Sequence, residues 1–450
     1  MNRSAEVTSA RATPSLGVWL IWLYAFWILT TPYLSPKLSF LATIRFERLL
    51  AGILICYSGS QMGVCYRNSK PLILFGTFFL ICLVSSFTSP LGGIERAEHW
   101  LAEYWKVALL FYFIVYSVQT KEHVYLVLLG ISAISLGYQL LSWRDFMAGG
   151  SYVFQQGIKR MVGIWSGGGI GAANGYAITT LFALPFFHLW TYYDNSWKRR
   201  FVKMLGVGLS IASIVFSGTR GAILVGITVV ASGVLIFSRR RIQLLALAAT
   251  VLGVAYGFMP EDLRIRYTDQ FLPHSESRAT DTKADEIASS SAEGRIEGLK
   301  DGYALFLQRP LLGWGPGTSG AARDSLPNAP FREEELQLHS LYGQIIAEVG
   351  LLGTLFFIML NWNLIASLLR VVKSSIPLER TLAGLLLTSF TIYWLYGFIS
   401  HTLFNQEWIL LFGLSTVLIS EYEWARSELP TESHLVDSSL QSPAGWGTCG

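Results

Sequence analysis

Long apolar runs recur from one end of this 450-residue chain to the other. Apolar residues make up 52% of the sequence and charged residues only 14%, whereas a soluble globular chain carries about 25% charged residues. A run of about 20 apolar residues is long enough to cross a bilayer as a helix. Within lipid, only helices and closed barrels satisfy their own backbone polar groups. The sequence therefore predicts a helical membrane protein with many spans.

We predict an all-α bundle of about 12 transmembrane helices. They cover residues 16–31, 49–64, 72–88, 100–118, 124–141, 170–192, 202–216, 223–237, 244–258, 351–369, 382–400 and 408–420. The fourth contains Glu103 and Lys106, so a position in the membrane interface is an alternative for it. No small-x-small cleavage site follows the first run, and we interpret it as an uncleaved span rather than a signal peptide.

The distribution of basic residues predicts the orientation. With the N-terminus in the cytoplasm, the short inside segments hold 16 Lys and Arg residues and the short outside loops hold eight, as the positive-inside rule requires. Residues 1–15 and 424–450 are then cytoplasmic. Residues 16–258 form the first nine spans, and residues 259–338 form a large periplasmic loop. Residues 339–423 hold a re-entry helix and the last three spans.

The large loop carries 9 basic and 14 acidic side chains, a net charge of −5. Residues 275–292 are rich in Ser, Ala, Asp and Thr, and we expect a flexible, solvated strip there. A capping box at Ser290 and Glu293 predicts the start of a helix. Pro310 predicts its end, because a proline cannot continue a helix.

Arg220 lies between two strongly apolar stretches. An Arg near the centre of a membrane helix costs about 2.5–3.5 kcal/mol, so it is kept where it lines a cavity, pairs with another group or has a function. The neighbouring Gly218 and Gly221 permit a tight turn and the close approach of a ligand. A helix starting here would also direct free N–H groups outward, which favours an anion. The alternative is an Arg that snorkels to the interface as an anchor.

Four further residues on the same predicted side are candidates. Arg295 follows the capping box, and its alternative is a solvated Arg paired with a carboxylate of the acidic loop. Arg264 and Arg266 follow the ninth span, where both can serve as simple interface anchors. His339 lies where the loop returns to the membrane, and its side chain can accept a proton at neutral pH. A structural role for His339 is the alternative.

We find no support for a bound metal or cofactor. The sequence has no DxD, no HExxH and no convergent His/Asp set. The four cysteines form no CxxC motif, so we predict neither zinc nor a disulfide framework. Glu348 is nine positions after His339 and would face the opposite side of a continuous helix, so we do not expect it to orient His339.

Several of these segments resemble the O-antigen ligase family, which shares its C-terminal signature with polysaccharide polymerases. They are SGTRGA at 217–222, GR at 294–295, RPLLGWGPG at 309–317, HSL at 339–341 and EVGLLG at 348–353, and Asn174 resembles the family's asparagine before an earlier span. Their order and spacing agree over about residues 160–365. The resemblance to this family implies a GT-C-type membrane glycosyltransferase of the bacterial inner membrane.

By this resemblance, Arg220 and Arg295 bind a polyprenyl-diphosphate-linked glycan donor, and His339 positions or deprotonates an acceptor hydroxyl. Arg264, Arg266 and Asn174 are further candidates for substrate binding. The implied reaction inverts the sugar C1 without a metal. The family also often has an acidic residue after the penultimate span, and Glu407 is the acidic residue of that stretch here.

Several functions remain open at this point. Ligation of the glycan to lipid A-core is our first prediction, and polymerisation of the glycan is the close alternative. A protein acceptor is the third. A function of another class is transport of an anion or a lipid-linked sugar, in which the arginines would line a path across the bilayer. We expect membrane lipid and these glycans as partners, and no nucleic acid.

Overall fold

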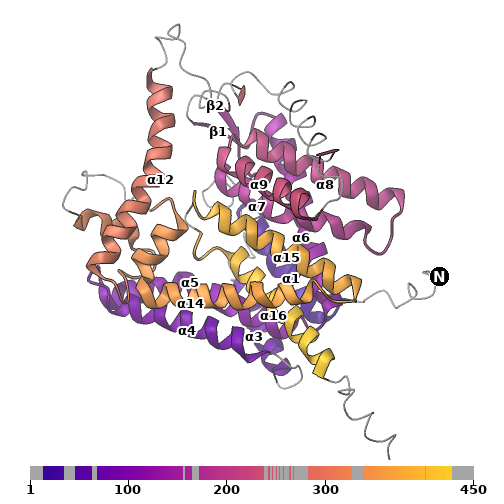
Figure 1. The fold of residues 1–450 in the computed structure, drawn as a ribbon, viewed down its shortest axis with the longest axis horizontal. Coiled ribbons are helices and arrows are strands. Elements are labelled where there is room, and N and C mark those ends of the chain that lie inside the picture. Colours follow the sequence, from indigo (N-terminus) through magenta and orange to yellow (C-terminus); the bar gives the residue numbers. More distant parts are fainter. Residues whose placement is uncertain are drawn as a thin grey trace, which may run out of the picture.

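The computed structural model describes residues 14–34, 46–62, 68–155, 158–164, 172–237, isolated positions between 242 and 267, and residues 282–326, 338–400 and 402–427. These residues are mostly helical (Figure 1). The first helices are α1 (Leu16–Leu34), α3 (Phe46–Gln61), α4 (Ser69–Phe87), α5 (Gly93–Ser117) and α6 (Lys121–Met147). The middle of the chain forms β1 (Tyr152–Gln155), β2 (Ile158–Met161), α7 (Ala173–Ala183), the 3-10 helix η2 (Leu184–Thr191), α8 (Trp197–Phe216) and α9 (Arg220–Phe237). The last part forms α12 (Thr282–Gln308), α13 (Ser319–Ala322), η3 (Arg323–Ser325), α14 (Leu341–Val371), α15 (Pro377–Tyr396) and α16 (Gln406–Ser427).

Three of the described helices, α4, α6 and α14, are long and apolar enough to cross a membrane. Shorter apolar segments occur at Leu16–Trp27, Tyr104–Ser117 and Arg220–Ala231. Large apolar side chains such as Leu80 on α4 and Trp362 on α14 are exposed, and an extended apolar surface requires an apolar surrounding such as lipid. The chain is therefore a helical membrane protein. The total of 12 spans stays a prediction, and most of the predicted span at 244–258 lies outside the described residues.

Helix α16 forms the centre of the packing. Its Trp408 is fully buried, and the ring lies 5.5 Å from Phe357 of α14, 6.1 Å from Phe390 of α15 and 5.6 Å from Phe412, between ring centroids. Aromatic pairs at these separations add attraction beyond that of the buried area. This cluster holds α14 and α15 in fixed positions around α16.

Helix α14 is interrupted at Gly350, whose backbone angles are φ 62° and ψ −162°. The segment 310–315 lies against the interruption, where the N–H of Gly315 donates to the carbonyl oxygen of Glu348 at 2.9 Å. Non-helical backbone at membrane depth is tolerated where protein groups satisfy it. The interruption is therefore a packed feature that ties the end of the large loop to α14.

The structure differs from the sequence-based expectation in three places. The hairpin β1–β2, which is antiparallel, is absent from the predicted all-α fold. The predicted span at 170–192 is instead the short helix α7 followed by η2, where Pro185 lies in the first turn. Helix α12 begins at Thr282, before the capping box, so the expectation of a flexible strip is wrong for residues 282–292. Ala, Glu and Lys favour helix in that stretch.

Candidate functional site

Arg220 is the first residue of α9, and the turn before it determines where its side chain begins. Residues 217–219 connect α8 to α9, and Gly218 has a φ of 63°. Such a left-handed conformation strains a residue that has a Cβ. The hydroxyl of Ser217 donates to Thr219 Oγ1 at 2.9 Å, which closes the turn on itself. The half-buried Arg220 therefore follows a compact turn and lies at the N-terminus of α9.

A second arginine, Arg160 of β2, is held against this turn and is only 4% exposed. Its Nε donates to the carbonyl oxygen of Ser217 at 2.8 Å, and its Nη2 donates to Thr219 Oγ1 at 3.2 Å. Burial lowers the pKa of Arg160, Tyr267 and Tyr396 offset part of that shift, and the charge of Arg220 lowers it further. The sequence alone does not distinguish Arg160 from the other basic residues of the predicted outer loops, because its partners Ser217 and Thr219 lie 57 and 59 positions away.

Asn174, in the first turn of α7, joins the same network. Its side-chain oxygen accepts from Arg160 Nη2 at 2.9 Å and from Thr219 Oγ1 at 3.2 Å. The hydroxyl of Tyr396, at the end of α15, donates to the carbonyl oxygen of Asn174 at 3.3 Å. The Asn174 residue itself is exposed. The network therefore joins β2, α7, the turn between α8 and α9, and the end of α15.

Arg295 approaches from α12, a segment distant in sequence. Burial lowers the pKa of Arg295, Tyr396 offsets part of that shift, and the nearby charge of Arg220 lowers it further. Since Arg220 also lowers the pKa of Arg160, Arg220 acts electrostatically on both of the other arginines. Three guanidinium groups from three elements thus concentrate positive charge in one region.

Close backbone contact brings α12 to α14. A Cβ placed on Gly302 of α12 would lie 2.6 Å from the backbone of Gly343 in α14, and one on Gly343 would lie 2.7 Å from the backbone oxygen of Gly298. Small residues at such positions let two helix backbones approach closely. In Figure 1, α12 otherwise extends away from the layer that contains α4, α5 and α14. This contact places Arg295 beside the start of α14.

His339 lies immediately before α14. The following residue, Ser340, caps the helix by accepting the N–H of Gly343 at 3.4 Å, and the N–H of Leu341 donates to the carbonyl oxygen of Gly397 after α15 at 2.7 Å. Partial desolvation lowers the pKa of His339, and the charges of Arg295 and Arg323 lower it further. His339 is therefore an exposed imidazole that is neutral at pH 7, next to Arg295.

Two further predicted site residues, Arg264 and Arg266, follow the predicted ninth span. Arg264 is half-buried, beside Leu263 and Tyr267, which pack against Ile158 of the hairpin. Its role in substrate binding stays a prediction. Arg266 lies outside the described residues.

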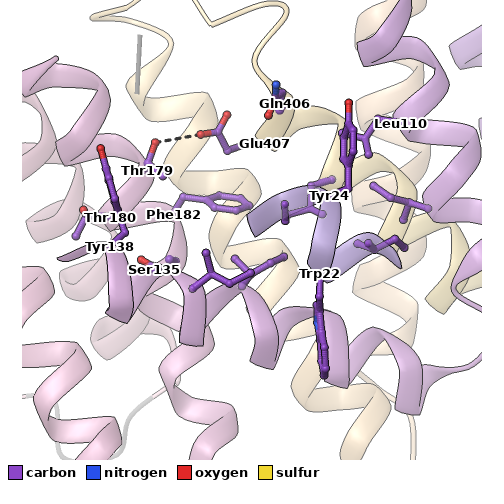
Figure 2. A pocket seen from close by; sticks show the side chains of 17 residues that line it. Trp22, Tyr24, Leu110, Ser135, Tyr138, Thr179, Thr180, Phe182, Gln406 and Glu407 are labelled. Carbon is purple, nitrogen blue, oxygen red and sulfur yellow. Dashed lines mark hydrogen bonds between the residues drawn. The ribbon is translucent and has the colours of Figure 1, made fainter. Parts of the chain in front are cut away.

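The two glutamates have partners away from His339. Glu348 is fully buried, and it accepts from the Ser319 hydroxyl at 2.7 Å and from the Gln344 amide at 3.2 Å. Its carboxylate thereby holds the start of α13 against α14. Glu407 accepts from the Thr179 hydroxyl at 3.1 Å and lines a largely apolar cavity of about 120 Å³, shown in Figure 2.

The arrangement favours an anion that carries more than one charge. Each guanidinium offers five N–H donors and stays protonated, and the start of α9 adds backbone donors. The charge of Arg220 lowers the pKa of Arg160 and of Arg295, so an anion between these groups would relieve their repulsion. A neutral imidazole at the edge of the same region is able to accept a proton from a hydroxyl.

No curated protein matches the chain at a significant level. Residues 205–358 match the family model described as O-Antigen ligase. That segment includes Arg220, Arg295 and His339, and it runs through the interruption of α14 at Gly350. Over this segment, the chain is similar to the O-antigen ligase family.

Proposed function

We propose that the protein is an inverting glycosyltransferase of the bacterial inner membrane. It moves a glycan from a polyprenyl diphosphate to a hydroxyl of lipid A-core at the periplasmic face. The similarity of residues 205–358 to the O-antigen ligase family supports a role in O-antigen assembly. The observation that carries the more specific proposal is the convergence of Arg220, Arg295 and His339 from α9, α12 and the start of α14.

The arginines bind the diphosphate of the donor. Guanidinium groups match phosphate oxygens in pairs of parallel hydrogen bonds. The leaving group gains charge as the bond between the sugar C1 and the phosphate oxygen breaks, so preorganised cations stabilise the transition state more than the bound donor. Arg220 and Arg295 supply these charges, and the N–H groups at the start of α9 add further donors.

His339 acts on the acceptor. The acceptor oxygen attacks C1 from the face opposite the diphosphate, its proton passes to His339, and the polyprenyl diphosphate leaves. This requires a neutral imidazole, which the lowered pKa of His339 provides at pH 7. Arg295 and Arg323 thus serve His339 by disfavouring its protonated form.

Polymerisation of the glycan uses the same donor chemistry with another acceptor. Transport of an anion predicts arginines along a path through the bilayer. The electrostatic effect of Arg220 on both Arg160 and Arg295 favours a single cluster over such a path, and we therefore prefer an enzyme.

Reconstitution in lipid vesicles tests the proposal. A defined polyprenyl-diphosphate glycan is offered with lipid A-core, with a glycan chain or with no acceptor, each with and without a chelator. We expect a lipid A-core product whose rate is unaffected by the chelator. His339→Ala should reduce transfer by about 10²–10⁴-fold, the usual contribution of a general base, while binding of inorganic diphosphate persists.

A product with the glycan chain alone would identify a polymerase. Movement of the intact donor across the membrane without transfer would identify a transporter. Loss of transfer with chelator would show that the arginines do not replace a metal.

A further inference from the structure

Arg160 contacts two different parts of the site through one planar group. Its Nη2 donates to the side-chain oxygen of Asn174 at 2.9 Å, and its Nε donates to the carbonyl oxygen of Ser217 at 2.8 Å. The first contact reaches α7, and the second reaches the turn before α9. At 4% exposure, Arg160 itself is shielded from a ligand in the open part of the site.

The contact with Asn174 sets the direction of that amide. A guanidinium only donates hydrogen bonds, so the atom of Asn174 that faces Arg160 must be the oxygen. Thr219 Oγ1 lies 3.2 Å from the same oxygen. The NH₂ group, on the other side of the amide carbon, is therefore turned away from Arg160. Because Asn174 is exposed, this NH₂ group is available as a donor to a ligand.

The contacts with the turn hold the backbone that precedes Arg220. Arg160 holds both Ser217 and Thr219, the residues on either side of Gly218 with its φ of 63°. Arg220 follows directly as the first residue of α9. A shift of this turn would therefore move both the Arg220 side chain and the N-terminus of α9.

We propose that Arg160 is a positioning residue, which turns the NH₂ group of Asn174 and the guanidinium of Arg220 toward the same diphosphate. The inference rests on the proposed function and extends it. Asn174 then binds a phosphate oxygen directly, whereas Arg160 acts through Asn174 and Arg220. A displacement of about 1 Å of a binding group can reduce the rate by about 10²-fold, which makes such a residue important without any contact to substrate.

The variant Asn174→Asp separates this role from simple packing. An Asp keeps the oxygen that accepts from Arg160 and Thr219, but it has no N–H to offer and adds a negative charge facing the ligand. We expect an unchanged or higher melting temperature, together with an increase of about tenfold or more in the KM for the donor, since the variant loses a hydrogen bond to a charged group and adds repulsion. Binding of inorganic diphosphate, measured by calorimetry, should weaken in parallel. An unchanged or lower KM would overturn the inference.

The variant Arg160→Lys tests the positioning itself. One ammonium group keeps the charge but cannot reproduce the planar set of bonds to Ser217, Thr219 and Asn174. We expect kcat/KM to fall by about 10²-fold. The matched control is Lys159→Gln on the same strand, because Lys159 lies over the Tyr152 ring at 4.2 Å and is exposed; its kcat/KM should equal that of the unmodified protein. Equal rates for Arg160→Lys and the control would contradict the proposal, and if Arg160→Lys does not fold, Asn174→Asp decides alone.

The experiments distinguish failure of the proposed function from failure of the proposed role of Arg160. If the unmodified protein neither binds inorganic diphosphate nor transfers a glycan, the proposed function is wrong. If it does both, and Asn174→Asp and Arg160→Lys do the same equally well, only the role of Arg160 is wrong.

Discussion

At the scale of single residues, the geometry of Arg220 matters as much as its charge. Arg220→Lys keeps one positive charge but loses the paired hydrogen bonds to phosphate. A hydrogen bond to a charged group contributes about 1.5–3 kcal/mol, and about 1.4 kcal/mol corresponds to a tenfold change in rate. We expect turnover to fall about 10- to 100-fold in the reconstituted transfer assay. Turnover near that of the unmodified protein would contradict a paired contact between Arg220 and the diphosphate.

The pH dependence of the reaction belongs to the same scale. The pKa of His339 lies below its usual value of about 6.5, because of desolvation and the charges of Arg295 and Arg323. As a base, His339 must be neutral, so kcat/KM should be constant near pH 7 and fall only as the pH drops below that usual value. Arg323→Gln removes a charge that disfavours the imidazolium, and it also leaves Asp301, whose salt bridge to Arg323 is 2.5 Å long, without that cation.

The acidic decline of Arg323→Gln should therefore occur at a higher pH than in the unmodified protein. Lys300→Gln on α12 is the control, since Lys300 is exposed and does not shift the pKa of His339. The measurement is the pH profile of kcat/KM for all three proteins. Identical profiles would show that another group controls the acidic decline.

At the scale of elements, the contact between α12 and α14 determines how near Arg295 lies to His339. Gly302→Ala would place a Cβ 2.6 Å from the backbone of Gly343. The backbone of Gly343 can move away from this Cβ only if α12 and α14 separate. We expect a loss of transfer of about 10²-fold, the usual result of a displacement of about 1 Å. Gly294→Ala on the same helix meets nothing within 4 Å, so its transfer rate should be unchanged. Equal rates for the two variants would mean that this contact does not position Arg295.

At the scale of the whole molecule, the aromatic cluster around α16 supports the bundle. Trp408→Ala removes a fully buried ring that touches α14 and α15. A cavity of this kind destabilises a protein by about 3–5 kcal/mol, and we expect a clearly lower midpoint of thermal unfolding in detergent. Trp362→Ala is the control, because Trp362 is 73% exposed on α14 and its loss leaves no internal cavity. A midpoint equal to that of the control would show that the cluster does not limit stability.

The amino-acid sequence alone was sufficient to predict a helical membrane protein and to propose three residues of the candidate site. In lipid, each apolar segment must form the hydrogen bonds of its own backbone, which it does as a helix. The membrane class can therefore be predicted from these segments without the tertiary structure. The family resemblance, now confirmed over residues 205–358, singled out Arg220, Arg295 and His339. Pro310 correctly predicted the end of α12, which closes at Gln308, because a proline blocks a helix through its own ring.

Only the tertiary structure decided what holds these residues together. Arg160 meets Ser217 and Asn174 through hydrogen bonds between segments distant in sequence, and such pairing leaves no periodic pattern along the chain. The glycine contact of α12 with α14 and the interruption at Gly350 likewise depend on the neighbouring backbone. The residues of a short segment determine whether that segment favours a helix or a lipid surrounding. The direction of a side chain within a site depends instead on partners that come together only when the chain has folded.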